Sequence, residues 1–296
     1  MNGKNVVLVG ALIFGSSALV SAQSVGKMIV TDVRNSAGDI VGVWEAPFHA
    51  SGKSWLQAAG IVGGAALVSL ADDDVDRFMV RTQHDPFWSS LKELREGGVG
   101  FSGKTVAPFA VGIYVVGLAT KSTSLREGVF GCVSSYVAQS LVRSFVFYQF
   151  VNRERPDSSR KHVAPPPPPA QQGDQYNFEF HEPIWGMQSF PAGHVANVAG
   201  CVSFLTNRFS MGVVEPALWV VVAGVGVGRM VDRRHWTSDT VLGTALGYAI
   251  GKEVAKRSMD RLDHNRSSPT VTDERQRGFY LAPGAHGVTL GWHATF

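Results

Sequence analysis

Six apolar segments rich in Gly, Ala and Val recur along this chain and constrain its fold more than any other feature. Most of them are about 15–20 residues long and show almost no alternation of polar and apolar residues, a pattern that favours helices over strands. We therefore expect an all-α fold built as a six-helix bundle. The six expected core helices are 56–71, 105–119, 128–150, 193–207, 214–231 and 239–255.

Composition narrows the class of protein further. A chain of 296 residues can bury one good-sized core, and nothing in it demands a second domain. Charged residues make up 17% of the chain, below the roughly 25% of ordinary soluble domains, so the helices pack either in a membrane or in a tight helical core. The net charge of +3 is small, and the basic residues form no continuous stripe, which argues against nucleic acid as a partner.

The N-terminus has the organisation of a secretory signal peptide, which we place at 1–22. Lys4 is the positive residue, Val6 to Val20 are largely apolar, and small residues at 20–22 offer a cleavage site. An uncleaved membrane anchor is the alternative. Both predict a protein of the cell envelope. Residues 23–55 show no clear periodicity and are interpreted as an irregular lead-in to the helical domain at 56–256.

Three polar regions are expected to connect or follow the helices. Residues 72–94 are acidic and amphipathic, and predict a short surface helix. Residues 157–190 contain five consecutive prolines, Pro165 to Pro169, which predict an extended spacer; the aromatic residues after it either cover the mouth of a site or belong to a plain surface insertion. Residues 257–296 are predicted to be a polar linker and then a C-terminal β-hairpin, because apolar residues alternate along its last strand and Gly284 can turn the chain.

The chain has two cysteines, Cys132 and Cys201, and both lie in apolar helical segments. We interpret them as buried free thiols rather than as a disulfide, although pairing cannot be determined from sequence.

A histidine and a carboxylate four residues apart suggest nucleophilic chemistry. His235 and Asp239 would lie on one helical face, about one turn apart, so that the carboxylate accepts a hydrogen bond from one imidazole nitrogen and leaves the other free to attack. Arg229, near the end of the preceding helix, has a planar set of donors suited to an oxyanion. This segment predicts attack on a phosphate-like group.

A second segment has the features of an anion-binding helix start. Pro191 suits the first position of a helix, and Gly193 lets a bound anion approach the N–H groups there. His194 would face the anion as a proton donor. Arg155, at the end of the third predicted helix, adds another guanidinium.

These residues occur in an order that resembles a known superfamily. Arg155-Pro156, then Pro191 to His194, then Arg229, His235 and Asp239, resemble the three motifs of the type 2 phosphatidic acid phosphatases and vanadium haloperoxidases. The resemblance covers roughly residues 56–256. It implies that His235 is the nucleophile that forms a phosphohistidine, that Asp239 orients it, and that His194 is first general acid and then base. It also implies that Arg155, Arg229 and the Gly193 amide bind the phosphoryl oxygens, and that the reaction needs no metal and no cofactor.

Three positions depart from the family pattern, and each loses a donor to the oxyanion. Tyr148 stands where the first motif has a lysine, while Ala192 and Gly228 each stand where the family has a serine. Tyr148 can still donate a weaker hydrogen bond. Arg153 is a candidate to supply the positive charge of the missing lysine. Against that role, Arg153 is better interpreted, with Arg233 and Arg234, as part of a solvated basic rim. We therefore expect altered phosphate binding rather than inactivity.

The sequence thus predicts an envelope phosphatase with a periplasm-facing site, acting on a lipid phosphate, an isoprenoid diphosphate or a small phosphate ester. It leaves open whether the helices are embedded in the membrane or only associated with its surface, because several segments are shorter than the roughly 20 residues needed to span. Two alternatives remain. One is a haloperoxidase that holds vanadate as its cofactor at His235. The other is a scaffold or binding protein that keeps the helical core without turnover.

Overall fold

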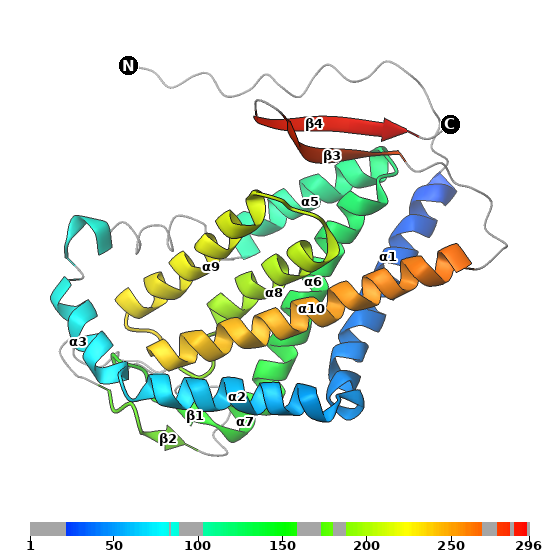
Figure 1. The fold of residues 1–296 in the computed structure, drawn as a ribbon. Coiled ribbons are helices and arrows are strands. Elements are labelled where there is room, and N and C mark those ends of the chain that lie inside the picture. Colours follow the sequence, from blue (N-terminus) through cyan, green and yellow to red (C-terminus); the bar gives the residue numbers. More distant parts are fainter. Residues whose placement is uncertain are drawn as a thin grey trace, which may run out of the picture.

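The computed structural model is a bundle of helices (Figure 1). The residues that it describes are 22–82, 84–88, 103–158, 173–179, 188–267, 277–284 and 287–294. Most of the predicted signal peptide, all five consecutive prolines, and Phe180 and Trp185 of the aromatic residues after them lie outside the described residues.

The expected all-α class is confirmed, since the described residues are mostly helical. Each of the six apolar segments overlaps a helix, but additional helices make the arrangement more complex than a six-helix bundle. The helices discussed here are α1 (Ala22–Glu45), α2 (Gly52–Ser69), α3 (Asp72–Thr82), α5 (Gly103–Ala119), α6 (Thr123–Val142), α7 (Tyr148–Phe150), α8 (Gly193–Arg208), α9 (Val214–Val231) and α10 (Thr237–Ser267).

Helix α8 lies at the centre of the core and packs most extensively on α10. Valine and alanine side chains of α8 meet those of α9 in one apolar cluster, and Phe204 joins a second cluster with α10. Glycines let α10 approach α8 closely: a Cβ added at Gly243 would come within 2.5 Å of the Ala192 carbonyl oxygen, and one at Gly247 within 2.3 Å of that of Ala196. The close approach fixes the starts of α8 and α10 relative to each other.

The expected irregular lead-in at 23–55 is wrong, because most of it forms α1 and α2. The buried face of α1 carries Asp32, Ser36, Asp39 and Val43, which follow helical spacing. Three of these four are polar and pair with other helices: Asp32 with Arg126, Ser36 with Ser134, and Asp39 with Arg261. An apolar pattern therefore does not reveal this helix.

Two further boundaries differ from expectation. The third predicted helix is interrupted, because residues Arg143–Phe147 form a π-helical turn between α6 and α7. The predicted linker from 257 is helical as far as Ser267, since α10 continues and its Arg257 and Arg261 bind the Gly42 carbonyl and Asp39 of α1. Contacts between distant helices, rather than local apolar spacing, extend α10.

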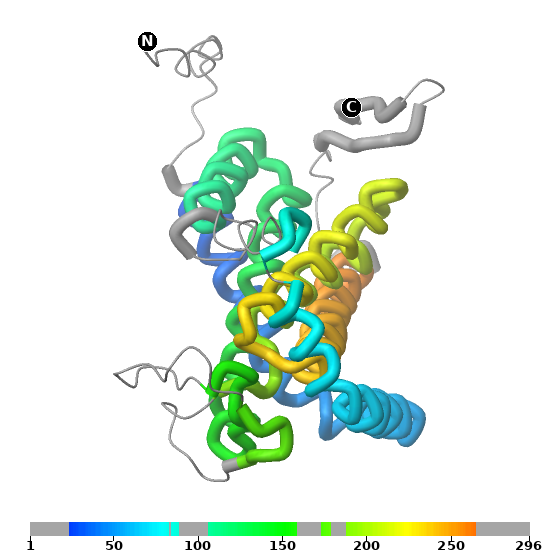
Figure 2. Tube along the Cα trace, turned by 90° about the vertical axis from the view of Figure 1, so that its left-hand side faces the viewer, coloured from blue at the N-terminus to red at the C-terminus, as the bar shows by residue number. Residues whose placement is uncertain are grey.

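Two short antiparallel strand pairs complete the described chain. Strand β1 (Asn152–Arg153) pairs with β2 (Phe178–Glu179), which lies within the predicted insertion at 157–190. Strand β3 (Arg277–Gly284) pairs with β4 (Gly287–Ala294) near the C-terminus. Figures 1 and 2 both place α7, β1 and β2 at one end of the bundle.

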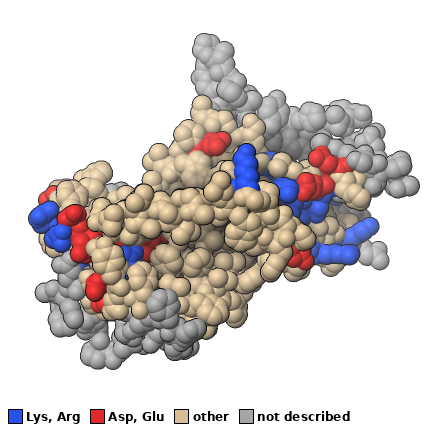
Figure 3. All heavy atoms as spheres, turned by 60° about the horizontal axis from the view of Figure 1, so that its bottom comes forward, with Lys and Arg blue, Asp and Glu red and all other residues tan. Residues whose placement is uncertain are grey.

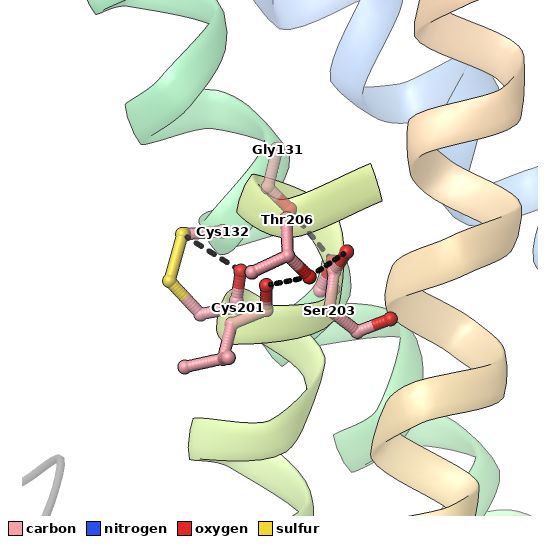
Figure 4. Close-up of a disulfide and its surroundings, with 7 residues drawn as sticks. Gly131, Cys132, Cys201, Ser203 and Thr206 are labelled. Atoms are coloured by element: carbon pink, nitrogen blue, oxygen red, sulfur yellow. Dashed lines mark hydrogen bonds between the residues drawn. A yellow bond between two sulfur atoms is a disulfide. The ribbon is translucent and has the colours of Figure 1, made fainter. Parts of the chain in front are cut away.

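The two cysteines form a disulfide between α6 and α8 (Figure 4), so the expectation of free thiols is wrong. The helices run close together at Cys132 and Cys201, with their Cα atoms 4.3 Å apart. This proximity arises from tertiary packing across a separation of 69 residues. Disulfides form and persist in oxidising compartments.

Replacing both cysteines should strongly destabilise the protein. A bridge across 69 residues restricts the unfolded chain, and the loop-entropy relation gives a loss of about 4 kcal/mol in the free energy of unfolding for Cys132→Ala/Cys201→Ala. Chemical denaturation of purified protein in detergent measures this difference. A reducing agent should lower the stability of the wild type by a similar amount and leave the double variant unchanged; a wild type insensitive to reduction would contradict the prediction.

Two helical stretches among the described residues are long and apolar enough to cross a membrane, Thr123–Phe150 and Val214–Val231. A third candidate span results if α2 and α3 form one broken span, with a bend of 56° between the two helices. Apolar side chains of α2, including Trp55, Leu56 and Leu67, are exposed. Figure 3 shows a broad face with few charges between charged ends of the molecule. These features are typical of a membrane-associated protein.

Candidate active site

The three sequence motifs meet at the end of the bundle that carries β1. Two backbone hydrogen bonds join them: the Ala192 N–H donates to the Asp239 carbonyl over 3.1 Å, and the Ser189 N–H donates to the Arg153 carbonyl over 3.1 Å. Both candidate spans also end here, at Phe150 and Val231. The site therefore lies at one end of the apolar part of the molecule.

His235 lies in the turn just before α10 and is buried, with 4% of its surface exposed. Its Nδ1 is 2.6 Å from the Ser189 carbonyl oxygen. A carbonyl only accepts hydrogen bonds, so Nδ1 must carry the proton in this contact. The neutral ring then has its lone pair on Nε2, the form required of an imidazole nucleophile.

The surroundings of His235 favour the neutral imidazole. Burial lowers the pKa of His235 well below its ordinary value, and the nearby Arg229 and Arg155 guanidiniums lower it further. The hydrogen bond to Ser189 opposes this effect only in part. At neutral pH the ring is therefore uncharged.

The predicted hydrogen bond from His235 to Asp239 is replaced by an indirect connection. His235 precedes α10, whereas Asp239 lies in the first turn of the helix, so the two side chains do not share a helical face. Asp239 Oδ2 instead accepts hydrogen bonds from the Trp236 N–H (3.0 Å) and the Ser189 hydroxyl (2.5 Å). The carboxylate caps α10. Asp239 is connected to the imidazole through Ser189. The Ser189 hydroxyl donates a hydrogen bond to Asp239, and the Ser189 carbonyl accepts one from His235.

Arg153 is neither part of a solvated rim nor placed to bind phosphate, because its donors are used inside the protein. It is 2% exposed. Its Nη1 donates to Asp239 Oδ1 and the Ser238 hydroxyl, both at 2.7 Å, and its Nη2 to Asp72 Oδ2 at 2.8 Å. Its Nε donates to the Gln175 carbonyl over 2.8 Å. Arg153 thus ties Asp239 to α3 and to the segment before β2.

The fully buried Asp239 carboxyl depends on this cation. Burial raises the pKa of Asp239, and the charge of Arg153 is the largest effect that opposes the rise. The hydrogen bonds from Ser189, Arg153 and Trp236 also oppose it. Arg153 therefore helps to keep Asp239 ionised.

Three of the remaining predicted site residues, Arg155, Arg229 and His194, lie close enough to His235 to act on its imidazole electrostatically. Arg155 and Arg229 are 9% and 8% exposed. Arg155 follows β1 rather than ending a helix, and burial lowers its pKa. Gly193 begins α8 after Ala192, so Pro191 precedes the helix instead of opening it. His194 is exposed in the first turn and close enough to His235 to affect its pKa.

The three departures from the family pattern are all buried. Tyr148 is 7% exposed, and Arg143, Arg155 and Arg229 lie close enough to act electrostatically on its hydroxyl. Ala192 and Gly228 offer no side-chain donor.

Two residues near the site had no role in the sequence analysis. Ser189 links Asp239 to His235 through its hydroxyl and its carbonyl. Asp72, in the segment expected to be a surface helix, is 1% exposed; besides binding Arg153, it accepts a hydrogen bond from the Ser238 N–H over 2.9 Å. Figures 1 and 2 show α3 beside the end of α9 and the start of α10. No local sequence pattern links Asp72 to its partners, which lie some 80 positions or more away. For Ser189, its position just before the second motif is a weak sequence signal of a role in the site.

Comparison with known proteins shows which family this part of the chain resembles. The family model described as the PAP2 superfamily matches residues 129–262. This part of the chain is therefore similar to the PAP2 superfamily. The matched PAP2 region contains His194, Arg229, His235 and Asp239 but not Asp72.

A curated relative is the lipid A 1-phosphatase of Porphyromonas gingivalis, 33% identical over 70 residues. The aligned part is 22% of this chain and spans only 15% of the length of that relative. No solved structure matches the chain.

Proposed function

We propose that this protein is a metal-independent phosphatase that forms a phosphohistidine at His235. The observation that carries the proposal is the state of His235. The ring is buried and neutral, its Nδ1–H donates to the Ser189 carbonyl, and two arginines lie close by. That combination suits a nucleophile for a dianionic phosphoryl group.

In the first step the Nε2 lone pair of His235 forms a bond to phosphorus, and the bond from phosphorus to the leaving oxygen breaks. His194, exposed in the first turn of α8, donates a proton to that oxygen. In the second step His194 removes a proton from water, whose oxygen attacks phosphorus. The bond to Nε2 breaks and phosphate leaves.

Positive groups held in place supply the electrostatic stabilisation. Arg155 and Arg229 would bind the equatorial oxygens with their planar donors, and the Gly193 N–H at the start of α8 would bind a third. Phosphoryl transfer depends mainly on such positioned charge. In this proposal the guanidiniums supply the charge that a metal ion provides in other phosphatases.

The substrate class follows from the position of the site. Two candidate spans end at it, so a headgroup at a membrane surface could reach it while the rest of a lipid stays in the bilayer. The similarity to a lipid A 1-phosphatase supports a phosphorylated lipid. We propose a lipid phosphate or an isoprenoid diphosphate, hydrolysed at the periplasmic face, with small phosphate esters as weaker substrates.

The test is phosphate release by purified wild-type protein from phosphatidic acid in mixed micelles and from a soluble aryl phosphate. Turnover of both that resists EDTA, with an acid-labile and alkali-stable phosphoenzyme after quenching, would support the proposal. Absence of turnover on every phosphate ester would favour the scaffold alternative. Bromide oxidation that appears on adding vanadate, without phosphatase activity, would favour the haloperoxidase.

Replacing His194 should separate substrates by their leaving group. His194→Asn should slow alkyl phosphates, whose alkoxide must be protonated, by about 100- to 10,000-fold, the range of general acid catalysis. Aryl phosphates, whose leaving group needs little protonation, should lose far less in the first step. The alkaline limb of the kcat profile for alkyl phosphates should also disappear. Equal losses on both substrate types would mean that His194 binds phosphate without delivering the proton.

A further inference from the structure

Arg143 occupies an unusual position between α6 and α7. It begins the five-residue π-helical turn Arg143–Phe147, and the Tyr148 N–H donates to its carbonyl. In an α-helix, residues five apart differ by about 140° around the axis, so they face different sides. The wider π turn brings them to the same side, and the Arg143 guanidinium lies over the Tyr148 ring, 5.4 Å from its centre. Such turns occur frequently at functional sites.

The same guanidinium reaches the start of α8. A Cβ added at Gly193 would lie only 1.5 Å from Arg143 Nη1, so any larger residue there would displace the arginine. The N-terminus of a helix carries a partial positive charge. The helix N-terminus therefore repels a neighbouring guanidinium, unless an anion lies close to both groups.

Most of the other charges near Arg143 are also positive. Arg143, Arg155 and Arg229 all act on the Tyr148 hydroxyl, so three guanidiniums converge around one side chain. The Asp239 carboxylate acts on it too, but that carboxylate is already paired with Arg153. Within the described part of the chain Arg143 forms no ion pair, and its buried Nε has no hydrogen-bond partner. The arrangement is electrostatically unfavourable by itself and would be stabilised by a multivalent anion.

We propose that Arg143 binds the phosphoryl oxygens of the substrate and supplies, from the π turn, the positive charge that Tyr148 lacks. This inference rests on the proposed phosphatase function and extends its binding site by one residue. It replaces Arg153, whose donors are occupied by Asp72, Asp239 and Gln175, as the source of the missing charge. Arg143 would reach the anion from the α6 side, while Arg155 and Arg229 approach it from β1 and α9.

The test compares wild type, Arg143→Gln and Arg143→Met, in which Met keeps the apolar stem but not the charge. Inorganic phosphate is the probe, and its dissociation constant is measured both as a competitive inhibitor and by its effect on thermal unfolding. Loss of one charge-assisted contact should weaken phosphate binding by about 10- to 100-fold. Arg77→Gln, which removes an exposed arginine of α3 about half accessible to solvent, is the matched control and should not change phosphate affinity.

Two further measurements distinguish ligand binding from a structural role. Adding Tyr148→Lys to Arg143→Gln should restore at least part of the phosphate affinity, because it returns a cation to the same place. Without phosphate, both single variants should be as stable as wild type or more stable, since a repelled charge is removed. Unfolding or clear destabilisation of both single variants would contradict the proposal, because it would show that Arg143 supports the fold.

The remaining outcomes separate this inference from the function on which it rests. If wild type binds phosphate and hydrolyses esters but the Arg143 variants bind phosphate equally well, only the role of Arg143 is wrong. If wild type neither binds phosphate nor hydrolyses any ester, both the phosphatase function and the role of Arg143 are wrong.

Discussion

The His235→Ala variant is expected to lose turnover by on the order of 10³-fold or more, because removal of the nucleophile eliminates the covalent step. The fold should survive, since the ring lies in a turn, where its Nδ1 donates to the Ser189 carbonyl. Phosphate release from an aryl phosphate measures the loss, and circular dichroism checks the helical content. Activity within tenfold of wild type would rule out His235 as the nucleophile.

The same variant also reports the charge state of the ring. In the unfolded chain His235 takes up a proton as the pH falls below about 6.5, whereas in the folded protein its pKa is well below that value. The depressed pKa therefore stabilises the folded state above pH 6.5, and this contribution is lost as the pH falls towards the folded pKa. His235→Ala should lose less stability than wild type between neutral pH and pH 5. His49→Ala, at an exposed histidine outside the site, should retain the wild-type activity and pH dependence.

Replacing Arg153 is the second change with a large expected effect, and it acts on both stability and catalysis. Arg153→Met leaves Asp72 and Asp239 buried without their shared cation, and breaking a buried ion pair from one side costs about 3–5 kcal/mol. Because Arg153 opposes the rise in the pKa of Asp239, the carboxyl should also become harder to ionise. The acid limb of the rate profile should then move to higher pH. Chemical denaturation and kcat measured against pH test the two effects.

Two comparisons isolate the role of Arg153. Arg77→Met removes an exposed pair with Asp73 and Asp74 and should change the free energy of unfolding by less than about 1 kcal/mol. Adding Asp72→Asn to Arg153→Met should recover part of the lost stability, because one uncompensated carboxylate is removed. An Arg153→Met protein with wild-type stability and an unmoved acid limb would show that Asp239 does not depend on this cation.

Much of the fold was predictable because its signals are local. Long apolar segments without alternation indicate helices wherever a helix buries apolar side chains, as α8 and α9 do. Helix α1 escaped prediction because its buried face is mostly polar, and its pairing with Arg126 and Arg261 exists only once α6 and α10 are in place. The disulfide was missed for the same reason, since the distance between Cys132 and Cys201 is set by how two helices pack.

The sequence by itself determined which residue types are available for phosphate chemistry, since two histidines, two arginines and a carboxylate at fixed spacings resemble one superfamily. Only the tertiary structure decided how they connect. Asp239 meets His235 through Ser189 because the turn before α10 takes the imidazole off the helical face. Arg153 is turned inward by Asp72, and Arg143 is brought to Gly193 by a π turn that apolar periodicity does not register. The physical reason is that spacing along a chain specifies the face of a helix, whereas buried charges are positioned by partners from distant segments.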